Sequence, residues 1–127
     1  MLPTSALILF AHGSRDPEWV RPFEHLRETI QRATPVSSIA LAYLESATPD
    51  LTTTIRMLAA SGVTSIRVLP LFLAMGKHLR DDIPALAQRA IAEFPDVDIE
   101  FLRALGEAPE FVNALTRIAL RSMPQDT

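Results

Sequence analysis

The chain has 127 residues, of which 48% are hydrophobic and 21% are charged, a balance typical of one ordinary globular domain and not of a disordered or fibrous chain. It contains no cysteine, so it can form no disulfide bond and offers no thiolate to a metal ion. The formal net charge of -3 gives no support to non-specific binding of nucleic acid or of an anionic membrane. An acidic substrate would need a local group of basic side chains.

The first apolar run, at residues 6–11, has no basic flank before it and no small-residue cleavage site after it. We interpret it as a buried strand and expect no targeting segment. No stretch approaches the roughly 20 apolar residues that a membrane-spanning helix needs, so we expect no membrane partner. The predicted location is the cytoplasm.

Short apolar runs alternate with amphipathic stretches, which predicts parallel units of strand and helix. We expect strands at residues 6–11, 38–44, 65–72 and 97–102. We expect helices at residues 17–33, 48–61, 81–94 and 108–122.

Asp16 is the expected N-cap of the first helix and Pro17 its first residue, where the missing N–H of proline costs nothing. Apolar side chains at helical spacing predict a stripe that packs in the core: Trp19, Val20, Phe23, Leu26, Ile30 and Ala33. We expect the second helix to open at Thr48 with Pro49 in its first turn, and the third at 81–82 with Pro84 in its first turn. The last helix has one apolar face: Phe111, Val112, Leu115, Ile118 and Ala119.

The connections are short and free of low-complexity sequence, so we expect a single domain over residues 1–123 and a polar tail at 124–127. Right-handed crossovers favour an open, four-stranded parallel α/β sheet of order 2-1-3-4 with helices on both faces. The direction of winding then reverses between the first and third strands, and ligands bind outside the carboxyl ends of strands at such a point. His12, Glu45 and His78 follow the first, second and third strands, so we expect them at this edge.

His12 comes directly after the first strand and is followed by Gly13, which lets the backbone turn, and by Arg15, which places a cation beside the imidazole. The alternative is a helix-entry loop in which His12 only satisfies backbone groups, because histidine is common in both settings.

The loop after the third strand carries Leu73 and Met75 and then Lys77, His78 and Arg80. Large apolar side chains at a loop rim could support a flat hydrophobic ligand, or they could pack on their own helix or on a partner subunit. The two cations make this rim basic although the chain is acidic.

Glu45 follows the second strand, where a carboxylate also commonly serves as a solvated or helix-capping group. His25 is expected on the surface of the first helix. Two imidazoles and a carboxylate suit Co²⁺, Ni²⁺ or Fe²⁺, although this ligand set is not diagnostic by itself.

Three segments together give a resemblance to a known family. They are HGSR at 12–15, LE at 44–45 with Pro49, and PLFL, GKH and DIP within 70–84. In this order and separation they closely resemble the short form of the sirohydrochlorin chelatases of the CbiX type, over nearly the whole chain.

The resemblance implies a chelatase-like fold and a class II chelatase that inserts a divalent metal into sirohydrochlorin without ATP, in cobalamin or siroheme synthesis. It implies that His12 and His78 are the two active-site histidines and that Glu45 is their acidic companion. Short members assemble as homodimers around the substrate cleft. The metal is a substrate, with Co²⁺ expected first and Fe²⁺ or Ni²⁺ as alternatives, and no organic cofactor is expected.

In this interpretation His12, His78 and Glu45 bind the incoming ion, and the imidazoles also accept protons near neutral pH. Leu73 and Met75 support the macrocycle face. We expect some of the three rim cations, Arg15, Lys77 and Arg80, to meet the carboxylates of the ring.

Two other functions fit parts of the sequence. A strand that ends in His-Gly is also similar to the histidine phosphatases, but their motif needs an arginine before the histidine and Ala11 stands there. The second alternative is a module that binds a metal or a tetrapyrrole and delivers it without turnover.

Overall fold

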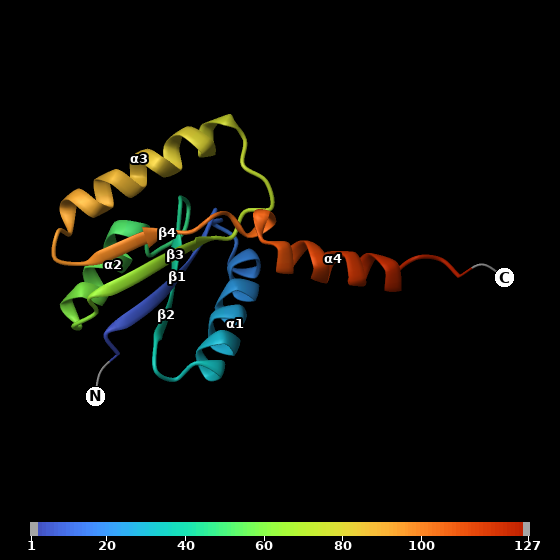
Figure 1. Cartoon of the computed structure of the whole chain (residues 1–127), viewed down its shortest axis with the longest axis horizontal. Coiled ribbons are helices and arrows are strands. Elements are labelled where there is room, and N and C mark those ends of the chain that lie inside the picture. The colour runs from blue at the N-terminus through green and yellow to red at the C-terminus, as the bar shows by residue number, and fades with distance from the viewer. Residues whose placement is uncertain (1–2, 126–127) are drawn as a thin grey trace.

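The computed structural model describes residues 3–125 and has a four-stranded parallel sheet at its centre (Figure 1). The strands are β1 (Ser5–Ala11), β2 (Ser38–Tyr43), β3 (Ser65–Pro70) and β4 (Asp98–Phe101). The helices are α1 (Pro17–Ala33), α2 (Leu51–Ala60), α3 (Lys77–Glu93) and α4 (Pro109–Arg121), and a short 3-10 turn, η1 (Leu105–Glu107), precedes α4. The sheet order is β2-β1-β3-β4, which confirms the predicted α/β fold.

The predicted strands all exist, each within two residues of its expected ends. Residues 126 and 127 of the predicted polar tail lie outside the described residues. Within residues 3–125, no helix is both long and apolar enough to cross a membrane.

The hydrophobic core lies between the sheet and the two helices α2 and α3. Alternate residues of the central strands, such as Ile8 and Val68, point into it because successive side chains of a strand face opposite sides. They pack there with Ile55 of α2 and Ile83 of α3. All of these residues are less than 10% exposed, and each contributes on the order of 2 kcal/mol through the burial of apolar surface.

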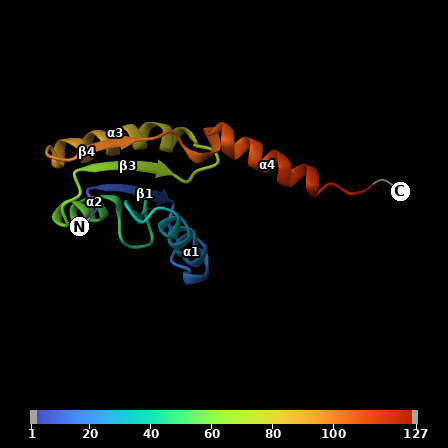
Figure 2. The same cartoon turned by 60° about the horizontal axis from the view of Figure 1, so that its bottom comes forward.

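The opposite face of the sheet is covered only in part. In the described chain α1 packs mainly on β2, whereas α4 extends away from the sheet in both views (Figures 1 and 2). No residue of α1 is buried within this part of the chain, so the prediction that its apolar stripe packs in the core is wrong. The stripe forms, and Trp19 stacks on Phe23 with ring centroids 4.6 Å apart, but within residues 3–125 its side chains are half-buried or exposed.

The predicted start of the first helix is confirmed, whereas two later starts are wrong. Asp16 caps α1 by accepting a hydrogen bond from the N–H of Glu18 at 2.9 Å. The second helix begins at Leu51, after the predicted Thr48, because the carboxylate of Asp50 is its cap. The third begins at Lys77, before the predicted 81–82, and holds Pro84 in its interior. Pro84 is exposed, so the helix loses one backbone hydrogen bond there without burying the unpaired carbonyl.

The loops after β1 and β2 are clamped together at the carboxyl edge of the sheet. Gly13 has a φ of 96°, and a Cβ at this position would overlap the carbonyl oxygen of Glu45. The N–H of Glu45 donates to the carbonyl of His12 at 3.0 Å, and the N–H of Leu44 donates to the carbonyl of Ala11 at 2.8 Å. Only glycine fits this turn, since it must supply both a positive φ and a close backbone approach.

The loop after β3 is held in a similar way. The N–H of Leu71 donates to the carbonyl of Phe10 at 2.7 Å, and the N–H of Gly106 donates to the carbonyl of Phe72 at 3.0 Å. A Cβ on Gly106 would overlap the carbonyl of Leu73. The turn η1 is therefore packed directly against the start of the β3–α3 loop.

We predict that Asp50→Ala lowers the free energy of unfolding by about 1 kcal/mol, because the N–H of Thr53 would lose its acceptor at 2.8 Å. Asp50→Asn should retain most of the stability. Hydrogen bonds from the side chain and backbone of Thr53 lower the pKa of Asp50 below 3.8. The charged carboxylate therefore makes its full contribution to the free energy of unfolding at pH values above the pKa that Asp50 has in the unfolded chain. This contribution is lost as the pH falls through the lower pKa of Asp50 in the folded protein. Urea titrations at neutral and acidic pH measure both effects.

We also predict that Gly13→Ala is more destabilising than the matched substitution Gly62→Ala. Gly62 has a φ of 100° and nothing within 4 Å of an added Cβ, so it reports the cost of the backbone conformation alone, about 1–2 kcal/mol. Gly13→Ala adds the collision with Glu45, which we expect to cost roughly 1–3 kcal/mol more. If chemical denaturation shows that Gly13→Ala and Gly62→Ala lose equal amounts of unfolding free energy, the clamp between the loops after β1 and β2 is contradicted.

Candidate functional site

The structure places His12 at the carboxyl end of β1, as the sequence predicts, with an exposed side chain. Its imidazole lies against the ring of Phe72, with ring centroids 4.4 Å apart and an angle of 52° between the ring planes. Phe72 is 1% exposed and itself packs edge-on to Phe10 at 6.1 Å. A rigid aromatic support thus fixes one side of the imidazole and leaves the other side open to a ligand.

Glu45 belongs to the same edge because the clamp at Gly13 joins its backbone to that of His12. Its side chain is exposed, and the next residue, Ser46, has a positive φ of 63°. A positive φ is uncommon for a residue other than glycine and is found often at functional turns. The fold therefore brings together the loops of two of the three predicted ligands.

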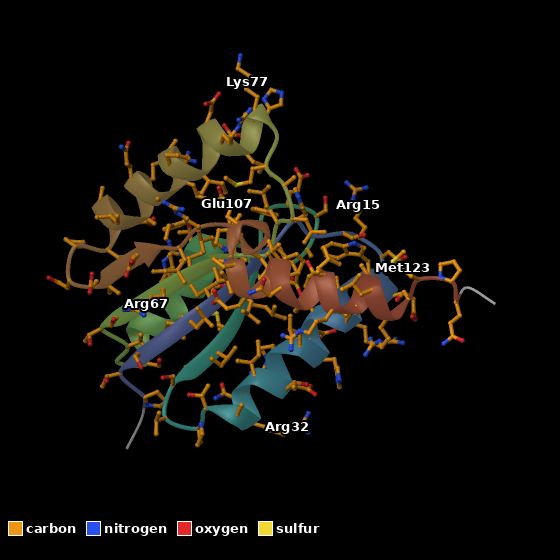
Figure 3. The ribbon with its side chains drawn as sticks, turned by 45° about the vertical axis from the view of Figure 1, so that its right-hand side comes forward. Arg15, Arg32, Arg67, Lys77, Glu107 and Met123 are labelled. Atoms are coloured by element: carbon orange, nitrogen blue, oxygen red, sulfur yellow. The ribbon has the colours of Figure 1, made fainter. Side chains whose placement is uncertain are left out.

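His78 and Lys77 lie in the first turn of α3 instead of in a loop. Both side chains are exposed, and Figure 3 shows Lys77 pointing outward from the beginning of this helix, well apart from Arg15 on the loop after β1. Within residues 3–125, no three histidine, aspartate or glutamate side chains are grouped closely enough to hold a metal ion. His12, Glu45 and His78 are thus not gathered into a three-ligand site by one chain.

Three of the predicted rim residues share a crevice of about 260 Å³: Leu73, Met75 and Arg80. Ala74, Ala104 and Glu107 of η1 also line it, and Leu73 is 68% exposed. An apolar side chain this exposed, next to a cation, suits a ligand that is flat and apolar with acidic substituents. The sequence gives no indication of Glu107, because nothing in its local pattern links it to the β3–α3 loop.

A second crevice, of about 420 Å³, flanks the same edge between the start of α2 and the middle of α3. Its polar lining includes Asp50, Asp82 and Arg89. Leu44, which directly precedes Glu45 in the chain, also lines it. None of these polar residues was predicted to be functional, although Asp82 belongs to the DIP segment that contributes to the family resemblance. The sequence gives no signal for Asp50 or Arg89, since each is an ordinary exposed charge of a cap or a helix.

Tyr43 ends β2 beneath this edge and is 2% exposed. Its hydroxyl group has no hydrogen-bond partner among the described residues. Burial, and then the negative charge of Glu24, raise the pKa of Tyr43 above its ordinary value of 10.0. The phenol therefore stays protonated at neutral pH.

Known proteins resemble this chain in both sequence and fold. Residues 6–121 match the CbiX family model. The sirohydrochlorin cobaltochelatase of Methanopyrus kandleri is 32% identical over 81 residues, which cover 64% of this chain and 57% of that protein. The sirohydrochlorin ferrochelatase of Bacillus subtilis is 27% identical over 110 residues, which cover 87% of this chain and 42% of that protein.

A solved structure shares the whole fold. The CbiX protein of Marinobacter aquaeolei, which is named for cobalamin biosynthesis, superposes with a TM-score of 0.80 and 37% identity, over 92% of this chain and 95% of that one. By contrast, the matched part of this chain spans little more than half of the length of the Methanopyrus relative. The family match covers β1 through α4 and includes every predicted site residue. The chain is therefore a member of the CbiX family.

Proposed function

We propose that this protein is a sirohydrochlorin chelatase, which inserts a divalent metal ion into the tetrapyrrole without ATP. The observation that carries the proposal is the match of residues 6–121 to the CbiX family, because this range includes His12 and Glu45 after the ends of β1 and β2 and His78 in the first turn of α3. Curated relatives are named as cobaltochelatases and as a ferrochelatase. We take Co²⁺ as the first candidate metal, with Fe²⁺ and Ni²⁺ as alternatives.

The reaction exchanges two protons for one metal ion. As the ion moves from water and protein ligands onto the four ring nitrogens, two pyrrole N–H bonds break and both protons need an acceptor. A neutral imidazole can bind the ion and can also take up a proton near pH 7, since its reference pKa is about 6.5. We assign these roles to His12 and His78, with Glu45 as a further oxygen ligand for the ion.

The surroundings of His12 support this assignment. Phe72 holds one face of the ring, and the clamp at Gly13 fixes the backbone on either side of it. An imidazole whose position is fixed in advance has less conformational freedom to lose when the metal arrives. Its exposure lets it pass a proton to solvent after the ion has entered the ring.

The rim residues suit the periphery of the substrate. Arg80, Arg15 and Lys77 would meet the acetate and propionate groups of the macrocycle, an arginine through paired hydrogen bonds and the lysine as a point charge. Leu73 and Met75 would lie beneath the apolar part of the ring, which removes exposed apolar surface from water.

We further propose that the working enzyme is a homodimer. One chain does not gather the three predicted ligands within its described residues, and a macrocycle is broad compared with the crevices of about 260 and 420 Å³ at this edge. Two copies that face each other would enclose the substrate and could supply ligands from both chains.

We predict that the protein accelerates anaerobic metallation of sirohydrochlorin, followed by visible absorbance with Co²⁺, Fe²⁺ and Ni²⁺ in turn. His12→Ala and His78→Ala should each lower kcat by about 100-fold or more, because each removes a group that transfers a proton or binds the ion. His25→Ala is the matched control, since it removes an exposed imidazole of α1 that lies outside the proposed site. It should leave the rate unchanged.

Two results would contradict this mechanism. A rate no faster than that of the protein-free reaction, with stoichiometric binding of metal or tetrapyrrole, would identify a delivery module. A catalysed rate that neither His12→Ala nor His78→Ala changes would keep the chelatase activity but remove these imidazoles from it.

A further inference from the structure

Three aromatic rings form a continuous stack that runs from the hydrophobic core to the candidate site. Phe10 and Phe72 are 0% and 1% exposed and belong to the core. Their rings pack edge-on with centroids 6.1 Å apart, and the ring of Phe72 also contacts the imidazole of His12, whose centroid is 4.4 Å away. The exposed imidazole is therefore the outer end of a stack whose two inner rings are buried.

The ring of Phe72 is held in place because the surrounding backbone is bonded to two neighbouring elements. The N–H of Leu71 donates to the carbonyl of Phe10 at 2.7 Å, which ties the β3–α3 loop to β1. The N–H of Gly106 donates to the carbonyl of Phe72 at 3.0 Å, which ties the same loop to η1. A buried aromatic side chain in a close-packed core keeps one rotamer. The surface that Phe72 presents to His12 is thus fixed before any ligand arrives.

The imidazole of His12 has no hydrogen-bonding partner that could orient it in the same way. Two polar side chains that follow it are engaged at the start of α1, where Ser14 accepts a hydrogen bond at 3.1 Å and Asp16 caps the helix. Within residues 3–125, no hydrogen bond joins a ring nitrogen of His12 to a side chain or to the backbone. The contact with Phe72 is therefore the interaction that sets the orientation of the ring.

This support differs from the usual support of a metal-binding histidine. Such a histidine generally donates the N–H of its second ring nitrogen to a carboxylate, a carbonyl or a water, and this hydrogen bond fixes the ring. The hydrocarbon ring of Phe72 can hold the imidazole in place, but it forms no such hydrogen bond and so engages neither nitrogen. One nitrogen of His12 can then bind an incoming ion while the other stays accessible to solvent.

We propose that Phe72 is a positioning residue for metal binding, which orients the imidazole of His12 by stacking in the place of a hydrogen-bonded partner and leaves both ring nitrogens free. The inference rests on the metal-binding role that the proposed function assigns to His12. Phe72 should then act on the affinity for the ion and on kcat, because both depend on the imidazole. It should not act on the binding of the tetrapyrrole, which depends on the rim.

We predict that Phe72→Leu weakens the binding of Co²⁺ to the full chain by about 10-fold, because leucine offers no flat ring to His12. Anaerobic isothermal titration calorimetry with the metal alone measures this change. Phe10→Leu is the matched control, since Phe10 lies in the same buried stack but packs on Phe72 and not on His12. It should leave the affinity for Co²⁺ unchanged. Both variants should lower the midpoint of urea unfolding to a similar extent, because each removes a buried ring.

NMR observes the stack directly in solution. The ring current of Phe72 displaces the signals of the His12 ring protons, which His12→Ala identifies by their loss. Phe72→Leu should remove this displacement, whereas Phe10→Leu should retain it. If circular dichroism shows that Phe72→Leu does not fold, Phe72→Met takes its place, because methionine adapts to irregular gaps in a core and also lacks a ring.

A double-mutant cycle tests whether Phe72 acts through His12. In the metallation assay, Phe72→Leu should lower kcat by about 10-fold and leave the KM for sirohydrochlorin unchanged. In the His12→Ala background the same substitution should change neither the affinity for Co²⁺ nor kcat, because the imidazole on which it acts is gone. A residue that only supports the fold would add its own loss in both backgrounds.

Two results would overturn the positioning role. Equal affinities of Phe72→Leu and Phe10→Leu for Co²⁺ would show that Phe72 only fills the core. A further loss from Phe72→Leu in the His12→Ala background would show that Phe72 acts on another group.

A failure of the proposed function is recognised separately, from the wild type and His12→Ala. If His12→Ala retains the native affinity for Co²⁺ and the native rate of metallation, His12 is not a ligand, and the positioning role is overturned before any variant of Phe72 is compared. If the wild type binds Co²⁺ through His12 but does not accelerate metallation, the chelatase activity is wrong, whereas the loss of affinity in Phe72→Leu would still support the positioning role.

Discussion

The contact between Gly13 and the carbonyl oxygen of Glu45 organises the edge of the sheet where the candidate site lies. It requires a residue without a side chain at a φ of 96°, and it joins two loops that are separated by the whole of α1 and β2. The backbones of His12 and Glu45 take their positions from this junction, and Phe72 holds the imidazole of His12 in addition. A change at Gly13 would therefore move both groups together, which makes this glycine a determinant of the site although it carries no chemistry.

The parts of the fold that could be predicted are those fixed by local chemistry and by chain topology. The limits of α1 follow from Asp16 and Pro17 at its start, and the sheet order follows from the handedness of the crossovers. The start of α3 could not be predicted in this way. The sequence pattern predicts Pro84 in the first turn, but an exposed proline is tolerated inside a helix whose N-cap is Gly76. As a result His78 lies on a helix and not in a flexible loop.

Periodicity predicts that a helix has an apolar face, but it does not say which molecule covers that face. This is why α1 and α4 have the expected stripes and yet contain no buried residue within the described chain. The same limit applies to the site. Topology predicts that His12 lies at the carboxyl edge, whereas its contact with Phe72 depends on how the β3–α3 loop turns back toward β1. Sequence spacing contains no such information.

The partly exposed sheet face and the separated candidate ligands both belong to a chain with one four-stranded sheet. Among residues 3–125 one face of this sheet has a complete helical layer, and His12, Glu45 and His78 are not grouped closely enough to hold a metal ion. The turn η1 connects this edge to the last helix, because the backbone of Gly106 is packed on Leu73 and its N–H donates to the carbonyl of Phe72. The position of Glu107 at the rim therefore depends on the same backbone contacts that fix where α4 leaves the sheet.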